Sequence, residues 1–136
     1  ARSAIFVQAF SRIGLTPDAG GTWSLPRRIG MARAMGAALF AEPIPAETAA
    51  AWGMIWEAAP DEDFAAVVAA RAAQLAAGPT LAYRLTRQAM RAGAAQDLAA
   101  QLALEAALQD QAGRSHDHDE GVAAFLEKRP ARYEGR

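Results

Sequence analysis

The chain of 136 residues contains no cysteine and only two histidines. The absence of cysteine excludes disulfides, thiol nucleophiles and cysteine-ligated metal sites. Apolar runs are short, and none approaches the ~20 residues that a membrane-spanning helix needs. The opening Ala-Arg-Ser-Ala lacks the apolar core of a secretory signal. We therefore expect a cytoplasmic protein that is not embedded in a membrane.

The chain also lacks an excess of positive or negative charge. Lysine and arginine together number 14, aspartate and glutamate 15, and the formal net charge is −1 at pH 7. Near-neutral charge gives no support for broad binding to nucleic acid or to anionic membranes. The length fits one small domain, which can bury roughly two-thirds of the surface that its unfolded chain exposes.

Helical patterns rich in alanine dominate the chain, and strand patterns are few. Residues 4–10 are apolar and predict a strand, and residues 54–58 predict a second short strand or edge segment. Pro26 lies inside the first helical pattern, where we expect a kink or a short 3₁₀ piece. Helices are predicted over residues 20–30, 32–40, 45–53, 64–76 and 97–112, from a cap at Thr80, and from Asp117 to near Pro130.

The most informative stretch, residues 16–23, combines a turn, one acid, a glycine pair and the start of a helix. Asp18 would lie at the N-terminus of that helix, beside backbone N–H groups that have no partner within the helix. Gly20 and Gly21 have no side chain, so another molecule could approach the backbone closely there. The spacing leaves two interpretations open. Asp18 caps the helix, or its carboxylate takes part in chemistry, and one carboxylate can do both.

The order of motifs along the chain resembles the enoyl-CoA hydratase/isomerase (crotonase) superfamily. The turn at residues 13–22, segments 27–30, 45–49 and 52–55, and the C-terminal segment 119–129 follow the family order and span nearly the whole chain. The matching part is the C-terminal half of a fold about twice this long. We therefore expect Ala1 to lie inside a longer protein.

The resemblance implies an α/β fold with a division of roles along the chain. Residues 1–58 would complete a crotonase-type spiral β-core, with one or two strands and the active-site turn. Residues 59–136 would form a mainly α-helical layer for trimerisation and CoA binding. The expected assembly is a homotrimer or a dimer of trimers.

The family binds acyl-CoA thioesters and stabilises a thioester enolate with two backbone N–H groups, which belong to the half that does not match here. Phe10 occupies the position of a catalytic glutamate of the hydratases, and Asp18 occupies a position where they usually carry glycine. This pattern is most similar to ring-1,2-epoxyphenylacetyl-CoA isomerases of phenylacetate breakdown. It implies an isomerase that shifts a double bond or rearranges an epoxyacyl-CoA, with Asp18 as the lone acid/base.

Other residues are expected at the substrate because of the same resemblance. Phe10 and Trp23 would form an apolar wall, and the alternative for both is plain core packing. Lys128 would reach the nucleotide end of CoA, and the alternative is a solvated cation at a helix C-terminus. The substrate-binding set is Phe10, Pro17, Gly20, Gly21, Trp23 and Lys128.

CoA belongs to the substrate thioester, so we expect no separate cofactor and no metal. Residues 116–119 alternate His and Asp, but the chain has no further histidine, and Asp117 with Glu120 has the spacing of a capping box for the last helix. Two other functions stay open. One is an enoyl-CoA hydratase that uses a glutamate outside this chain, and the other is a non-catalytic oligomerisation or binding module.

Overall fold

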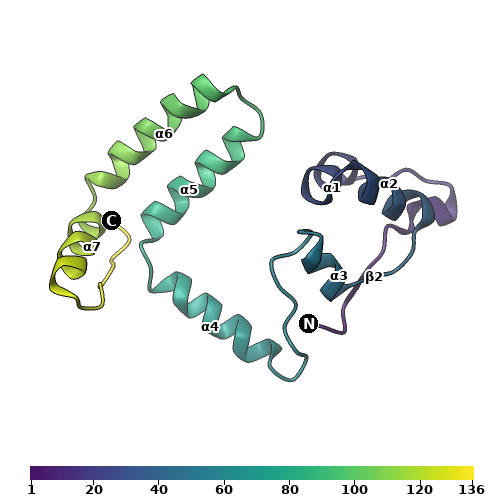
Figure 1. The fold of residues 1–136 in the computed structure, drawn as a ribbon, viewed down its shortest axis with the longest axis horizontal. Coiled ribbons are helices and arrows are strands. Elements are labelled where there is room, and N and C mark those ends of the chain that lie inside the picture. Colours follow the sequence, from purple (N-terminus) through teal and green to yellow (C-terminus); the bar gives the residue numbers. More distant parts are fainter. The chain divides into compact units, whose positions relative to one another are not determined.

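The computed structural model describes residues 1–136, which divide into two compact units, Ala1–Val68 and Ala69–Arg136. Figure 1 shows the ribbon with its helices labelled. The division falls within helix α4 (Phe64–Ala76). The different roles expected for residues 1–58 and 59–136 stay predictions.

The first unit contains a minimal two-stranded sheet. Strand β1 (Ile5–Phe6) pairs antiparallel with β2 (Ile44–Pro45), so that Ile5 lies opposite Pro45 and Phe6 opposite Ile44. The expected strand over residues 4–10 is therefore right only near its start, because the backbone then enters the 3₁₀ helix η1 (Ala9–Ile13). Pro45 has no N–H for a longer ladder, and the chain turns directly into a helix. The strand expected over residues 54–58 is wrong, since residues 54–56 form bends and residues 57 and 58 belong to no strand.

Helices α1 (Gly21–Ile29), α2 (Met31–Phe40) and α3 (Ala46–Ala51) complete the first unit. Helix α1 continues through Pro26, so the expected 3₁₀ piece is absent. Gly30 separates α1 from α2 with a φ of 80°, which a glycine adopts without the steric penalty of a Cβ. The centre of the core is small: Ala37, Ile44 and Ala49 are buried, and larger, partly buried side chains pack around them, namely Phe6, Leu25, Trp52, Met54 and Ile55.

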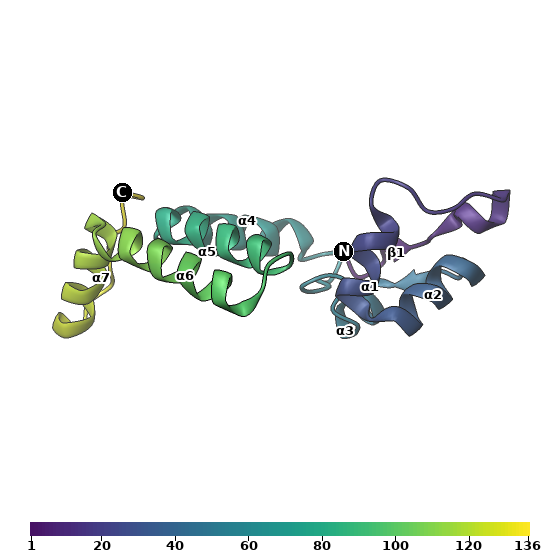
Figure 2. The same cartoon turned by 90° about the horizontal axis from the view of Figure 1, so that it is seen from above.

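The second unit is helical. Helices α5 (Thr80–Gly93) and α6 (Leu98–Gly113) lie side by side as an antiparallel pair, which Figure 2 shows from above, and α7 (His116–Glu127) follows. Leu85 of α5 and Leu108 of α6 are buried. Asp97 caps α6 by accepting a hydrogen bond from the Ala100 N–H at 2.8 Å, close to the expected start. Thr80 is the first residue of α5, and its expected role as a cap is wrong because Pro79 occupies that position.

No single helix is long and apolar enough to cross a membrane. Helices α4 and α5 meet such a criterion only together, by length and composition, as a pair bent by 100°.

Candidate active site

Asp18 lies in an exposed turn just before α1, and its carboxylate is free of intrachain hydrogen bonds. The cap of α1 is Gly20, which has no side chain to accept a hydrogen bond, so the interpretation of Asp18 as the helix cap is wrong. The turn is closed by the backbone, because the Gly21 N–H donates to the Asp18 carbonyl at 2.8 Å. The carboxylate is therefore available to another molecule.

Two successive residues in this turn have left-handed backbone conformations. Ala19 has a φ of 49° and Gly20 a φ of 79°. The left-handed region costs an L-residue roughly 1–2 kcal/mol, a penalty that glycine avoids. A Cβ built on Gly20 would meet no atom within 4 Å, so glycine is favoured there by backbone conformation, and the space beside it is open. The approach of another molecule to the backbone at Gly20 stays a prediction.

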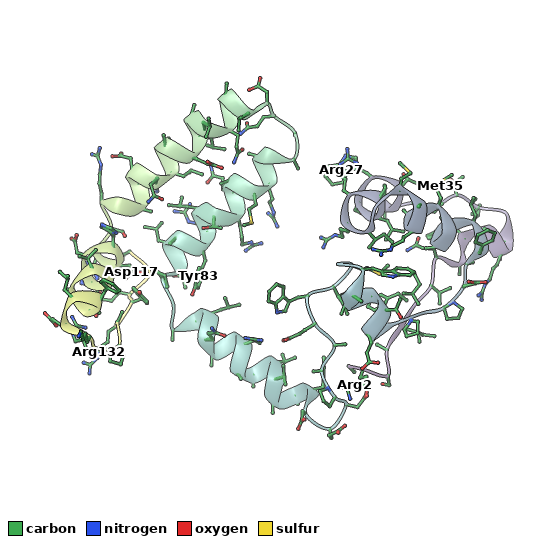
Figure 3. All side chains as sticks on the ribbon, viewed as in Figure 1. Arg2, Arg27, Met35, Tyr83, Asp117 and Arg132 are labelled. Carbon is green, nitrogen blue, oxygen red and sulfur yellow. The ribbon has the colours of Figure 1, made fainter.

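A small apolar cavity of about 90 Å³ lies beneath the turn, between α1 and α2. Pro17 and Gly21 line it on the side of the turn, and Leu25, Met31 and Met35 contribute apolar side chains. Figure 3 shows Met35 on α2 and Arg27 on the neighbouring α1. The structure thus brings two of the expected substrate-binding residues, Pro17 and Gly21, to the wall of one cavity.

Phe10 and Trp23 do not line this cavity. Phe10 is half-buried in η1, and its carbonyl accepts from the Leu15 N–H at 3.0 Å. Trp23 is 55% exposed, and the Arg27 guanidinium stacks on its ring at 4.1 Å from the centroid. Arg27 also donates to the Trp23 carbonyl at 2.8 Å. Their role as an apolar wall for the substrate stays a prediction.

Lys128 belongs to the second unit, at the C-terminus of α7. It adopts a left-handed conformation with φ 54° and ψ 40°, and its N–H donates to the Phe125 carbonyl at 3.3 Å. The following N–H, of Arg129, donates to the Ala124 carbonyl at 3.0 Å, which completes the helix cap. The Lys128 ammonium is exposed and has no ion-pair partner, so it is available to an external anion.

Glu120 and Arg129 form a bidentate ion pair next to Lys128. Arg129 donates from Nη1 to Glu120 Oε1 at 2.6 Å and from Nη2 to Oε2 at 2.9 Å. Arg129 Nε also donates to Glu127 at 2.6 Å, and the Arg132 N–H donates to Glu120 at 2.8 Å. The hydrogen bonds from Arg129 and then from Arg132 lower the pKa of Glu120 from 4.5 to about 2, while partial desolvation opposes them.

Asp117 is buried, with 3% of its surface exposed, and it does not cap α7. Its two carboxylate oxygens accept from the Glu134 N–H at 2.7 Å and the Gly135 N–H at 2.9 Å. The cap is Ser115, whose hydroxyl accepts from the His118 N–H at 3.1 Å. The predicted capping box of Asp117 and Glu120 is therefore wrong. The Ser residue three positions before His118 was an available signal for the true cap.

The alternating His and Asp residues 116–119 do not converge. No group of three His, Asp or Glu side chains in the chain could hold a metal ion. His116 Nδ1 lies 3.8 Å from Asp117, but Asp117 is already engaged by the two backbone N–H groups. Of these four side chains, Asp117 holds the segment that returns along α7.

Comparison of the sequence with protein families gives a match over residues 1–136 to the family described as enoyl-CoA hydratase/isomerase. A Rhodobacter capsulatus protein named "Probable enoyl-CoA hydratase" is 62% identical over 136 residues, which are 100% of this chain and 53% of the relative. The 1,2-epoxyphenylacetyl-CoA isomerase of Escherichia coli is 49% identical over 136 residues, 100% of this chain and 52% of the relative.

Solved structures show the same fold. An enoyl-CoA hydratase from Bacillus anthracis superposes with a TM-score of 0.93 at 30% identity, covering 99% of this chain and 52% of that protein. One from Polaromonas sp. JS666 gives a TM-score of 0.92 at 31% identity, covering 98% and 52%. The chain spans about half the length of the relatives it matches. The expected α/β class with a helical layer is confirmed.

Proposed function

Since the chain belongs to the enoyl-CoA hydratase/isomerase family, we propose that it provides the proton-transferring part of an acyl-CoA isomerase, with Asp18 as the acid/base. The substrate class is an enoyl-CoA or epoxyacyl-CoA thioester, as in phenylacetate or fatty-acid breakdown. The relative named as a 1,2-epoxyphenylacetyl-CoA isomerase, 49% identical, supports this choice. A trimeric assembly is part of the same proposal.

The observation that carries the proposal is the unengaged carboxylate of Asp18. Aspartates in turns can accept hydrogen bonds from nearby backbone N–H groups, yet Gly20 occupies the cap position and leaves Asp18 exposed and without a partner. The adjacent strained backbone at Ala19 holds the turn in a conformation that an unconstrained chain would avoid. Such strain is often found at functional sites.

For a double-bond shift, the Asp18 carboxylate removes a proton from C2 of a 3-enoyl thioester. The electron pair of the C–H bond enters a dienolate whose charge rests on the thioester oxygen. The protonated Asp18 then returns its proton to C4, the double bond moves to C2–C3, and the carboxylate is regenerated. No water is consumed. A positioned acid/base contributes roughly 10²–10⁴-fold, and backbone donors outside this chain would stabilise the enolate charge.

The residues around the turn fit a reaction that uses a single acid/base and consumes no water. Phe10 cannot transfer a proton, so this chain supplies no second acid at that position. The cavity lined by Pro17 and Gly21 has a volume of about 90 Å³. That is the space of about three water molecules, enough for one end of an acyl group. Gly20 leaves the backbone accessible on the open side of the turn.

A second candidate is hydration of an enoyl-CoA, in which a glutamate outside this chain works with Asp18. The 62% identical relative that bears a hydratase name favours it. The two reactions differ in whether a water oxygen enters the product, so they can be separated by assay.

The test is a paired assay on the intact protein with a 3-enoyl-CoA for isomerisation and crotonyl-CoA for hydration. Each assay is run with the wild type, Asp18→Asn and the control Asp63→Asn, which changes another exposed aspartate of the same unit. Isomerisation without hydration, lost only in Asp18→Asn, is the expected result. Hydration at a comparable rate would favour the second candidate. Turnover retained by Asp18→Asn would refute Asp18 as the acid/base.

A further inference from the structure

The cavity beneath the turn that carries Asp18 has a wall that is almost wholly apolar. Helices α1 and α2 supply alkyl and thioether groups to it, and only Gln8 and Thr22 bring polar side chains. Thr22 is exposed, whereas Gln8 is half-buried. Small-molecule sites are commonly built in this way, with a mostly apolar wall and a few polar groups that fix the orientation of the ligand.

The carboxamide of Gln8 lies beside the turn and has no partner within the chain. A Cβ built on Gly21, the first residue of α1, would lie 3.9 Å from Gln8 Oε1. Gln8 precedes η1, but its side chain makes no cap hydrogen bond to that helix or any other hydrogen bond within the chain. A half-buried amide without a partner costs free energy that an apolar side chain of the same length would not. Gln8 therefore does nothing for the fold that methionine could not do.

We propose that Gln8 selects acyl groups that carry an oxygen atom, by donating a hydrogen bond from its side-chain NH₂ to that oxygen inside the cavity. The inference rests on the function proposed above, and it favours an epoxyacyl or other oxygen-bearing thioester over a plain enoyl thioester. The NH₂ of a carboxamide has two donors, which suit a ketone, epoxide or hydroxyl oxygen. An acyl group of carbon and hydrogen alone would displace water from the cavity and leave the amide unpartnered. A site that contains a hydrogen-bonding group discriminates against a ligand that lacks the matching atom.

The experiment measures the Kd of the intact protein for 5-oxohexanoyl-CoA and for hexanoyl-CoA. The two thioesters have the same chain length and differ in one ketone oxygen, which can accept a hydrogen bond but cannot donate one. Neither has a double bond to move, so binding is measured apart from the chemistry of Asp18. We expect the wild type to bind the ketone about three- to tenfold more tightly, as for one hydrogen bond between uncharged groups.

The decisive variant is Gln8→Met, which keeps the length of the side chain, removes the amide and breaks no hydrogen bond within the chain. It should bind the two thioesters equally well. Thr22→Val is the matched control, because it removes the other polar group of the same wall and should keep the preference for the ketone. Gln8→Glu keeps the side-chain shape but has no donor when ionised. It should lose the preference as well, and it replaces Gln8→Met if thermal unfolding shows that the latter is poorly folded.

The outcomes separate the role of Gln8 from the proposed function. Equal binding of the two thioesters by the wild type would overturn the role of Gln8 and leave the acyl-CoA proposal intact. A preference that survives Gln8→Met, or one that is lost only in Thr22→Val, would overturn it as well. A preference lost in Gln8→Met, together with turnover retained by Asp18→Asn, would support Gln8 and refute Asp18 as the acid/base. A wild type that binds neither thioester would contradict the acyl-CoA function and the role of Gln8 together.

Discussion

Replacing Asp117 with asparagine should release the C-terminal segment from α7. The carboxylate has two acceptor oxygens and uses both, at 2.7 Å to the Glu134 N–H and 2.9 Å to the Gly135 N–H. Asparagine keeps the size but has one acceptor, so one N–H would face an amide NH₂. A hydrogen bond to a charged group contributes about 1.5–3 kcal/mol. Allowing for weakening of the second bond, the free energy of opening should fall by about 2–3 kcal/mol.

Hydrogen exchange of the residue 134 and 135 amides in the intact protein measures this change directly. A loss of about 2–3 kcal/mol corresponds to exchange roughly 30- to 150-fold faster at these two amides. The matched control is Asp110→Asn, which removes an exposed pair with Arg114 and should cost less than about 1 kcal/mol. Exchange at residues 134 and 135 that changes no more in Asp117→Asn than in Asp110→Asn would refute the reasoning.

Two further predictions concern pH and backbone strain. The folded pKa of Glu120 is about 2, below its unfolded value of 4.5, so the stabilisation of the fold by the Glu120 carboxylate is complete above pH 4.5 and is lost as the pH falls toward 2. The unfolding temperature of Glu120→Gln should therefore depend less on pH between 5 and 2 than that of the wild type. The same pH dependence in both proteins would contradict the lowered pKa. Gly20→Ala should lower the free energy of unfolding by about 1–2 kcal/mol through backbone conformation alone. Gly36→Ala in α2, where a Cβ also meets no atom, should raise it by about 0.5–1 kcal/mol. Urea unfolding that ranks the two variants the other way would refute this account.

Helix positions were predictable where the pattern is local. Helix α4 has the bounds expected from the recurrence of Phe64, Val67 and Val68, and α6 starts next to the expected residue because Asp97 caps it. Helical periodicity and capping depend on residues at most four positions apart. The sequence alone therefore contained the information needed for them.

Strands were less predictable for the opposite reason. Residues 4–10 have a strand composition, but only Ile5 and Phe6 find a partner, about 40 residues further along the chain. A ladder needs that partner to present free N–H and C=O groups, and Pro45 with the start of α3 ends it. No local pattern in residues 4–10 reports where the partner stops.

The amino-acid sequence by itself determined the family, the order of the helices, and the acid and cation that are candidates for chemistry, because these follow from residue types and short spacings. Only the tertiary structure decided which acids are engaged. Asp117 and Glu120 look like a helix cap in sequence, yet they bind amides 12 to 18 residues away, and Asp18 looks like a cap but has no partner. Whether a carboxylate is hydrogen-bonded within the chain or free to bind another molecule depends on the donors that folding brings to it. Those donors come from distant parts of the chain.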